Sequence, residues 1–493
     1  MTLVHRVLFP EPIASLDEYL ARGGGVGLEK ALGMSSDALI AEVLASGLRG
    51  RGGAGFPTGV KWRTVRDFHA NGRASSVVVN GAEGEPGTFK DRTLLRTSPY
   101  PVIEGALIAA KAVGADWISF ALKRAFTREV ARLQDAIDEV REAGWGRELR
   151  MDIFQGPGEY LYGEETALLE VIDGRYPFPR VSPPWRRGDR EVVETEADVR
   201  TGSGLSAHVE MAGEGGDDVP PTLVDNVETI ANIPRIIGRG AAWFRTEGTE
   251  KSPGTIVCTI TGSVQRAGVG EVIMGTPLRE AIELIGGGPR PGHRIKAVMG
   301  GVSAPLITAA QLDTPLSYED MAAIGSGLGA GGFIVFDDGD DLAAVAAGVS
   351  RFLAVESCGQ CVPCKIDGLA LADRLARLAR SDATTADLAK IKSLASTVGD
   401  RARCFLATQH QGVVGSIIQS FGPELEAHVG RYGAGGVEPI LVAELVDISG
   451  DTAVLDEHHL DKQPDWTFGP EYSGKVPAEL FADHRNPLPL EDA

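Results

Sequence analysis

Residues 47–62 read GLRGRGGAGFPTGVKW, a glycine-rich loop that follows the helical pattern SDALIAEVLAS at 36–46. The apolar run SSVVVN at 75–80 has the length of a short buried strand and leads into the turn-rich GAEGEPG. Helical patterns follow from about 101 to 113 and from 129 to 143, so helices and strands alternate up to about residue 172. This alternation predicts one α/β domain built around the glycine loop.

The glycine loop is a weak indication of a ligand when it is taken alone. Residues 50–55, GRGGAG, fit the spacing G-x-G-x-x-G, but the dinucleotide fingerprint needs a strand before the loop and an acidic residue about 20 positions further on. A helix precedes the loop here, so that fingerprint fails. Clustered glycines still let backbone N–H groups approach a phosphate or a flat ring, and Lys61 supplies a countercharge. The alternative is a glycine-rich turn without a ligand.

Carboxyl and amide side chains gather in three further stretches. They are NGAEGEPG at 80–87, YGEET at 162–166 and the pair DN at 225–226. The first follows the end of a buried strand, where ligands of α/β domains tend to bind. The other two precede helical patterns, so helix capping is the alternative for both. Around a glycine loop, such a set can hydrogen-bond the ring edge and ribityl hydroxyls of a flavin.

The rest of the chain divides into regions of different character. Residues 186–221 are rich in Arg, Glu, Gly and Asp and are interpreted as an exposed insertion. Residues 253–338 predict a small α+β domain in the order strand, helix, strand, strand, and residues 341–429 have helical patterns nearly throughout. From residue 430 onward one apolar run, PILVAELVDI, interrupts a polar tail that we expect to lie over another surface.

The cysteines indicate a metal centre. Cys358, Cys361 and Cys364 follow one another in CGQCVPC, and Cys404 lies forty positions further on across a predicted helical hairpin. Zinc sites usually come as two separated CxxC pairs, whereas three close cysteines and one remote cysteine are typical of a cubane. We therefore expect a [4Fe-4S] cluster, with zinc as the alternative. Cys258, alone in a predicted strand, is expected to pack as a small hydrophobe.

Composition excludes several classes of protein. A length of 493 residues allows about three domains, and no stretch approaches the roughly 18 apolar residues of a membrane span. With 48 basic and 68 acidic residues the formal charge is −20, which makes nucleic acid an unexpected partner. The opening MTLVHRVLFPEPIAS has no apolar export segment, so the expected location is cytoplasmic, including the periphery of a membrane complex.

These motifs, with ESCGQCVPCK at 356–365 and a remote RCF, resemble the NADH-binding flavoprotein subunit of bacterial complex I and the diaphorase subunits of NAD-dependent formate dehydrogenases and hydrogenases. The resemblance implies an α/β Rossmann-like FMN domain with N-terminal helices (1–250), a ubiquitin-like α+β SLBB domain (251–338) and a four-helix-type bundle with the cluster (339–429), followed by a C-terminal extension (430–493). It also implies a thioredoxin-like [2Fe-2S] partner subunit within a larger redox complex.

The resemblance assigns site residues by motif. The FMN would be lined by Gly50, Gly52, Gly53, Ala54, Lys61, Asn80, Glu83, Gly163, Glu164, Asp225, Asn226 and Thr229. The nicotinamide nucleotide, NAD(H), would meet Phe56, Glu85, Glu165 and Trp185. The cluster would be held by Cys358, Cys361, Cys364 and Cys404. The implied activity exchanges a hydride between NAD(H) and FMN and passes single electrons to the cluster, without a catalytic acid or base.

The chain departs from the family pattern at several of these positions. Ala82 stands where the family's NADESEPG has an aspartate, Thr64 where an aromatic is usual, Ser182 where a lysine is usual, and Asp225 where the first of two asparagines is usual. These departures indicate a divergent member with altered nucleotide affinity or a different partner complex. Two alternatives follow: a flavin and iron–sulfur relay that uses another donor, and a structural relay whose nucleotide binding has decayed.

Overall fold

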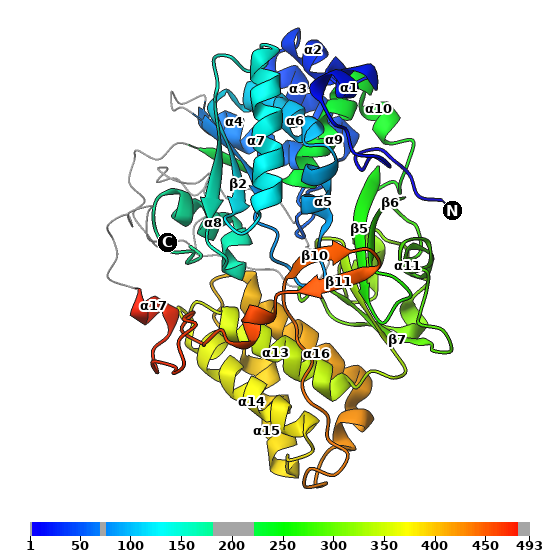
Figure 1. Ribbon diagram of the computed structural model, residues 1–493, viewed down its shortest axis with the longest axis vertical. Coiled ribbons are helices and arrows are strands. Elements are labelled where there is room, and N and C mark those ends of the chain that lie inside the picture. Colours follow the sequence, from blue (N-terminus) through cyan, green and yellow to red (C-terminus); the bar gives the residue numbers. More distant parts are fainter. Residues whose placement is uncertain (1, 70–74, 181–220, 482–493) are drawn as a thin grey trace.

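The computed structural model describes residues 2–69, 75–180 and 221–481, and it arranges them as an α/β domain, a second sheet with its own helices, and a helical bundle (Figure 1). Trp185, Ser182 and nearly all of the predicted insertion at 186–221 lie outside the described residues. None of the helices in the described part of the chain is long and apolar enough to cross a membrane.

The first domain is centred on a parallel sheet of four strands in the order β3-β2-β1-β4. The strands are β1 (Ser75–Gly81), β2 (Ala115–Lys123), β3 (Arg150–Gly156) and β4 (Thr222–Asn226). Val77 and Val79 on one face of β1 pack in the core with the long helices, whereas Val78 on the other face packs with the helix that begins at Glu165. Side chains therefore alternate between two layers of helices, as expected for a doubly covered parallel sheet.

The helices of this domain have the periodicity that the sequence predicts. The loop at 47–57 lies between α3 and α4, which confirms that a helix precedes it. The elements are α1 (Leu16–Ala21), α2 (Val26–Leu32), α3 (Ser36–Ser46), α4 (Thr58–His69), α5 (Lys90–Thr97), α6 (Tyr100–Val113), α7 (Thr127–Glu142), the 3-10 turn η1 (Tyr160–Gly163), α8 (Glu165–Ile172), α9 (Val227–Arg239) and α10 (Ala241–Phe244).

The strand order creates a switch point between β1 and β4. From β1 the chain moves outward on one side through β2 and β3, and it then returns to add β4 on the other side of β1. The crossovers at such a point leave a crevice at the carboxyl ends of the two strands, which is where open α/β sheets bind ligands. Asn80 and Asn226 lie opposite each other at these ends.

The second sheet has five strands in the order β6-β5-β9-β7-β8, with β5 and β9 parallel and the other pairs antiparallel. The sequence prediction missed β6, a glycine-containing segment that is completed only by pairing with β5, and the two-residue β8. The elements are β5 (Thr255–Gly262), β6 (Gly268–Ile273), α11 (Leu278–Gly286), β7 (Ile295–Gly300), β8 (Ile307–Thr308), η3 (Ala309–Gln311), α12 (Tyr318–Ala323) and β9 (Gly332–Asp337). Cys258 is fully buried in β5, where it packs with apolar neighbours as expected.

The third region is a bundle around α13 (Leu342–Glu356), in which every residue except Arg351 is buried. The cysteine loop follows α13 and enters a π turn, η4 (Pro363–Asp367), before α14 (Gly368–Ala379), α15 (Thr385–Thr397) and α16 (Phe405–Glu426). The remaining chain forms a hairpin of β10 (Leu445–Ser449) and β11 (Thr452–Leu455), then η5 (Glu457–Leu460) and α17 (Pro477–Leu480).

Candidate functional site

The glycine loop is a closed turn with an open tip. The Gly50 amide donates to the Phe56 carbonyl over 2.8 Å, which joins the two ends of the turn. Gly52 and Ala54 at the tip are exposed. Gly55 has φ +64° and a Cβ there would lie 2.3 Å from the ring of Tyr318, so only glycine fits without displacing that ring. The loop therefore presents unobstructed backbone to a ligand.

Contacts from two domains hold this turn over the crevice. The Arg51 amide donates to Thr229 Oγ1 over 2.8 Å, and a Cβ on Gly52 would lie 3.1 Å from that of Asn226, so the loop lies directly on the start of α9. From the second sheet domain, the Tyr318 hydroxyl donates to the Gly50 carbonyl over 2.7 Å. The sequence motifs at 50–55 and 225–229 therefore meet in space, as predicted.

Asn80 and Gly163 connect the end of β1 to the YGEET stretch. Asn80 Nδ2 donates to the Gly163 carbonyl over 2.8 Å, and its Oδ1 accepts from the Ala82 amide over 3.1 Å. A Cβ on Gly163 would lie 3.1 Å from the Ala82 carbonyl, so glycine permits the close approach of these two chain segments. Ala82 itself is buried at this junction.

Lys61 and Asp225 place opposite charges at the mouth of β4. Lys61 Nζ lies 3.1 Å from Glu165 Oε2 and donates to the Val224 carbonyl over 2.8 Å. Trp62 Nε1 donates to Asp225 Oδ2 over 2.8 Å. Burial raises the pKa of Asp225 to about 6, although the charge of Lys61 and the bond from Trp62 oppose the rise. Asp225 therefore titrates above the usual range of an aspartate.

Glu164 and Asn226 both cap helices. Glu164 Oε2 accepts from the amides of Thr166 and Ala167 over 3.0 and 2.9 Å at the start of α8, and Asn226 Oδ1 accepts from the Glu228 amide over 3.0 Å at the start of α9. The capping alternative is therefore observed for both residues. Capping also fixes these side chains at helix N-termini that open on the crevice, where a phosphate or electron-rich ring edge is favoured.

Glu83 is held by α5. Its carboxylate accepts from Arg92 Nε and from the Asp91 amide, both over 3.0 Å, and it is buried. Next to it, Lys90 Nζ lies 2.7 Å from Asp91 Oδ1 and 3.0 Å from Glu228 Oε2, with no exposed side-chain surface. This buried charge network forms the floor of the crevice, and the sequence analysis assigned no role to its lysine.

Glu85 lies where the three domains meet. Its carboxylate accepts from the Tyr160 hydroxyl over 2.5 Å and from the Val302 amide of the second sheet domain over 2.6 Å. Gln409 of the bundle lies 3.4 Å from the same hydroxyl. Burial raises the pKa of Glu85 to about 7, against the lowering by Tyr160 and Val302. Tyr160 was missed by the sequence analysis, although it stands only two residues before the YGEET motif.

Phe56 and Thr64 lie near the loop but contribute differently. Phe56 is half-buried at the end of the glycine turn, so part of its ring is available to a ligand. Thr64 Oγ1 donates to the Val60 carbonyl within α4 over 3.0 Å and faces solvent. The structure therefore leaves no aromatic side chain at this position of α4.

The four predicted cysteine ligands converge on one hollow. Cys358, Cys361, Cys364 and Cys404 all line a volume of about 290 Å³, solvent at its mouth included, between the start of α14, the start of α16 and η1. Burial raises the pKa of Cys364 to about 11, so its thiolate form requires the positive charge of a bound metal. The donor set is therefore that of a thiolate-bound metal centre.

The spacing of the sulfurs favours a cluster over a single zinc ion. Four thiolates on one zinc lie about 3.8 Å apart, as tetrahedral Zn–S bonds of about 2.3 Å require. Among the described residues, the group of three or more His, Cys, Asp or Glu side chains whose ligand atoms all lie within 4.8 Å is His293, Asp337 and Asp338, and no three of the cysteine sulfurs meet that limit. A cubane, whose iron atoms separate the thiolates, accommodates the wider set.

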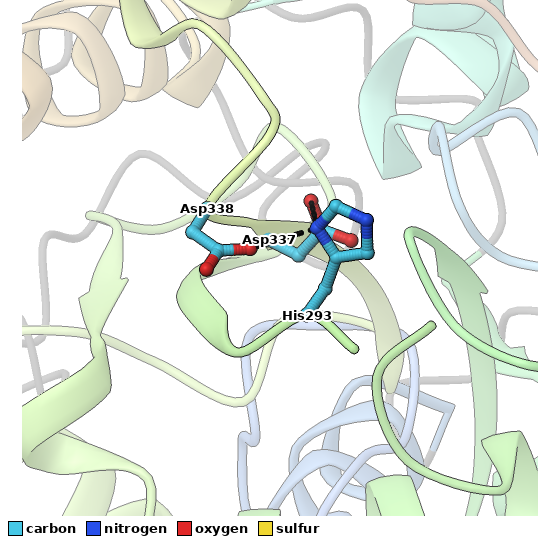
Figure 2. A group of neighbouring side chains, drawn as sticks. All are labelled: His293, Asp337 and Asp338. Atoms are coloured by element: carbon cyan, nitrogen blue, oxygen red, sulfur yellow. Dashed lines mark hydrogen bonds and ion pairs between the residues drawn. The ribbon is translucent and has the colours of Figure 1, made fainter. Parts of the chain in front are cut away.

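The group of His293, Asp337 and Asp338 is an ion-pair network on the second sheet domain (Figure 2). His293 Nδ1 lies 2.8 Å from Asp338 Oδ1, and Arg290 donates to both oxygens of Asp337 over 2.7 and 2.8 Å. The guanidinium therefore already compensates the buried carboxylate. The acidic cluster is satisfied without a metal ion.

The turn η1 links the crevice to the thiol hollow. Leu161 lines the hollow with the cysteines, and Gly163, two residues further on, accepts the hydrogen bond from Asn80. Consecutive Cα atoms are about 3.8 Å apart, so these two positions are separated by at most about 7.6 Å. Glu164 follows immediately, and its charge adds to the burial that raises the pKa of Cys404. The two candidate cofactor sites are therefore neighbours.

Three family models match the chain in sequence order. Residues 43–235 match the Nuo51 FMN-binding domain, 257–307 the SLBB domain and 344–428 the NADH-ubiquinone oxidoreductase-F iron-sulfur binding region. The fold and the site therefore define a three-part flavin and iron–sulfur protein, which confirms the predicted fold class and cofactor domains. Ligand contacts of individual residues stay predictions.

Curated relatives and a solved structure agree with this assignment. The second F-type subunit of the NADH-quinone oxidoreductase of Rhizobium meliloti is 36% identical over 84% of this chain and 94% of its own length. NADP-reducing hydrogenase subunit HndC of Solidesulfovibrio fructosivorans is 37% identical over 84% and 81%. The H2-reduced NAD+-reducing [NiFe]-hydrogenase superposes with a TM-score of 0.71 at 30% identity, over 85% of this chain and 68% of that chain. The chain therefore belongs to the family of F-type subunits of NADH-quinone oxidoreductase.

Proposed function

We propose that this chain is the electron-entry or electron-exit subunit of a larger redox complex, exchanging electrons between NAD(H) and FMN and relaying them through a [4Fe-4S] cluster. The observation that carries the proposal is η1, since Leu161 lines the thiol hollow while Gly163 and Glu164 border the crevice. When bound, the flavin converts a two-electron donor into single electrons, which is the step that a cluster needs.

The glycine turn and the ends of β1 and β4 are the proposed FMN site. The exposed tip at Gly52 and Ala54 leaves room for a flat ring, and Lys61 supplies positive charge beside it. The lining residues are those predicted by motif: Gly50, Gly52, Gly53, Ala54, Lys61, Asn80, Glu83, Gly163, Glu164, Asp225, Asn226 and Thr229. In this assignment Asn80, Glu164 and Asn226 orient the ligand, and Glu83 acts through α5.

Phe56, Glu85, Glu165 and Trp185 are the proposed contacts of the nicotinamide nucleotide. Phe56 is half-buried beside the turn, and Glu85 is at the three-domain junction. Glu165 pairs with Lys61, so that a nucleotide entering here competes with an existing ion pair. Cys358, Cys361, Cys364 and Cys404 are the proposed cluster ligands.

The face around Cys361 is the proposed docking surface of a [2Fe-2S] partner subunit. Three large apolar side chains, Val362, Ile366 and Phe405, are 69%, 50% and 56% exposed next to the ligands. Arg401 and Arg403 are exposed beside them, so the surface favours an acidic partner with an apolar centre. Such a partner would make the chain a peripheral cytoplasmic component of its complex.

Two acceptors test the proposal with one preparation. The protein reconstituted with FMN, iron and sulfide is mixed with NADH or NADPH, and reduction of ferricyanide is compared with reduction of a [2Fe-2S] protein purified with the complex. We expect a reduced nicotinamide donor to support both reactions. Absence of ferricyanide reduction with either donor in a flavin-replete sample would reject the proposal.

A pair of variants tests the docking face. Ile366→Glu is expected to slow reduction of the [2Fe-2S] protein at least tenfold without changing ferricyanide reduction, because it places a charge in the apolar centre. Leu32→Glu on α2, where the leucine is 66% exposed in the first domain, is the matched control and is expected to change neither rate. Equal rates for Ile366→Glu and wild type would move the docking face elsewhere.

A further inference from the structure

The C-terminal extension crosses the other three regions of the molecule. Residues 430–481 lie beyond the last family match, which ends at residue 428. The Ile440 amide donates to a carbonyl of α13 over 3.3 Å, Glu444 lies 2.5 Å from Lys123 at the end of β2, and the Asp451 carbonyl accepts from the segment between β5 and β6 over 2.7 Å. In Figure 1 the hairpin β10–β11 lies at the meeting point of these regions.

The extension grips the base of the iron–sulfur loop through Glu356. This residue ends α13, two positions before Cys358, and is 3% exposed. Lys462 Nζ lies 2.8 Å and His459 Nε2 3.2 Å from its Oε1, and both side chains come from the extension. Its other oxygen, Oε2, accepts from the Tyr160 amide over 3.1 Å. One carboxylate therefore joins the extension to the first residue of η1.

Further contacts reach the loop itself. The Ala478 amide donates to the Cys358 carbonyl over 2.8 Å. Gly359 has φ +83°, and a Cβ there would lie 2.5 Å from Val476, so the extension packs directly against the loop backbone. Trp466 Nε1 donates to the Val355 carbonyl over 3.0 Å. The extension therefore covers the Cys358 side of the loop and leaves the Cys361 side for a partner.

Charge balance makes Lys462 the decisive contact. Glu356 and Lys462 are both nearly fully buried, and an unpaired carboxylate in such a place is strongly disfavoured. The lysine allows the carboxylate to remain ionised, and the ionised carboxylate holds the Tyr160 amide. Loss of the ammonium would therefore loosen both the end of α13 and the turn that separates the flavin site from the thiols.

We propose that the C-terminal extension is an intramolecular clamp, in which Lys462 is a positioning residue that acts through Glu356 to hold the iron–sulfur loop against η1. The inference rests on the proposed function, because it gives the clamp the task of keeping the cluster in register with the flavin site. It adds a role for a segment that the matched family regions do not include.

The test compares three full-length variants with wild type: Lys462→Met, the double variant Glu356→Gln/Lys462→Met, and Lys475→Met. Lys475 is an exposed lysine of the same extension and serves as the matched control. The measurements are the rate of cluster loss to a chelator, the EPR spectrum of the reduced cluster, bound FMN, and ferricyanide reduction by NADH.

We expect Lys462→Met to lose the cluster at least tenfold faster than wild type and to change the EPR spectrum of the cluster that remains, with bound FMN unchanged. The double variant, which has no uncompensated carboxylate, is expected to recover most of the cluster retention, and Lys475→Met to match wild type. Recovery in the double variant also keeps the test valid if Lys462→Met folds poorly.

Wild-type cluster retention and EPR spectrum in Lys462→Met would overturn the clamp while leaving the proposed function intact. Faster loss without a spectral change, or without recovery in the double variant, would reduce Lys462 to a general stabilising residue and would also overturn it. A wild-type protein that binds no FMN, combined with faster metal loss in Lys462→Met, would instead reject the proposed function and retain the clamp.

Discussion

Replacement of Lys90 by methionine is the sharpest test of the buried charge network beneath the proposed flavin site. The Lys90 ammonium has no exposed surface and lies 2.7 Å from Asp91 Oδ1 and 3.0 Å from Glu228 Oε2. Burial already raises the pKa of Asp91 to about 6, and the lysine opposes that rise. The variant keeps the side-chain volume but leaves Asp91 and Glu228 buried without their cation.

Removing one partner of a buried ion pair costs about 3–5 kcal/mol, because the remaining charge is uncompensated. In a domain of about 150–250 residues this corresponds to a fall in Tm of roughly 6–20 °C. We expect urea unfolding of Lys90→Met, followed by circular dichroism, to show this loss. FMN affinity is expected to fall as well, since Lys90 also donates to Asn226 Oδ1 over 3.1 Å.

A double-mutant cycle with Glu228→Gln separates the ion pair from other effects of the substitution. The double variant is expected to be more stable than the sum of the single effects predicts, by about 1–3 kcal/mol, because each single variant leaves an uncompensated charge. Lys30→Met, at an exposed lysine of α2, is the control. A loss below about 1 kcal/mol for Lys90→Met, or strict additivity, would refute the reasoning.

Three further predictions concern the separate parts of the site. Cys361→Ser is expected to lose the cluster absorbance and keep bound flavin, and equal loss of both would show that the two sites are not separate. The pKa of Glu85 rises from 4.5 to about 7 on folding, so its contribution is fully present below about pH 4.5 and is lost as the pH rises through 7, about 3 kcal/mol in all. Glu85→Gln without nucleotide should therefore gain Tm over wild type between pH 5 and 8, and parallel curves would contradict this. Gly55→Ala is expected to raise the Kd of FMN several-fold, because its Cβ displaces the Tyr318 ring and its φ is positive. Gly158→Ala, where a Cβ meets nothing within 4 Å, should leave the Kd unchanged.

The motifs and most helices could be predicted from local patterns. The helix at 36–46 has the predicted bounds, and the four cysteines converge as their spacing indicates. These features depend on residues that are close in sequence, on hydrophobic periodicity and on thiolate chemistry, all of which are visible in the chain itself. The approach of the glycine loop to residues 225–229 was predicted through the family motifs and is observed in the structure.

Other features depend on contacts between distant residues, so only the tertiary structure could decide them. Lys90 and Lys462 would be expected at the surface, and both are buried because Glu228 and Glu356, far away in sequence, compensate their charges. The short strand β6 forms only through its ladder with β5. Tyr160 and the C-terminal extension likewise gain their positions from folding. The sequence by itself determined the cofactor-binding motifs, whereas folding decided which buried charges stabilise them, because charge compensation depends on distance in space.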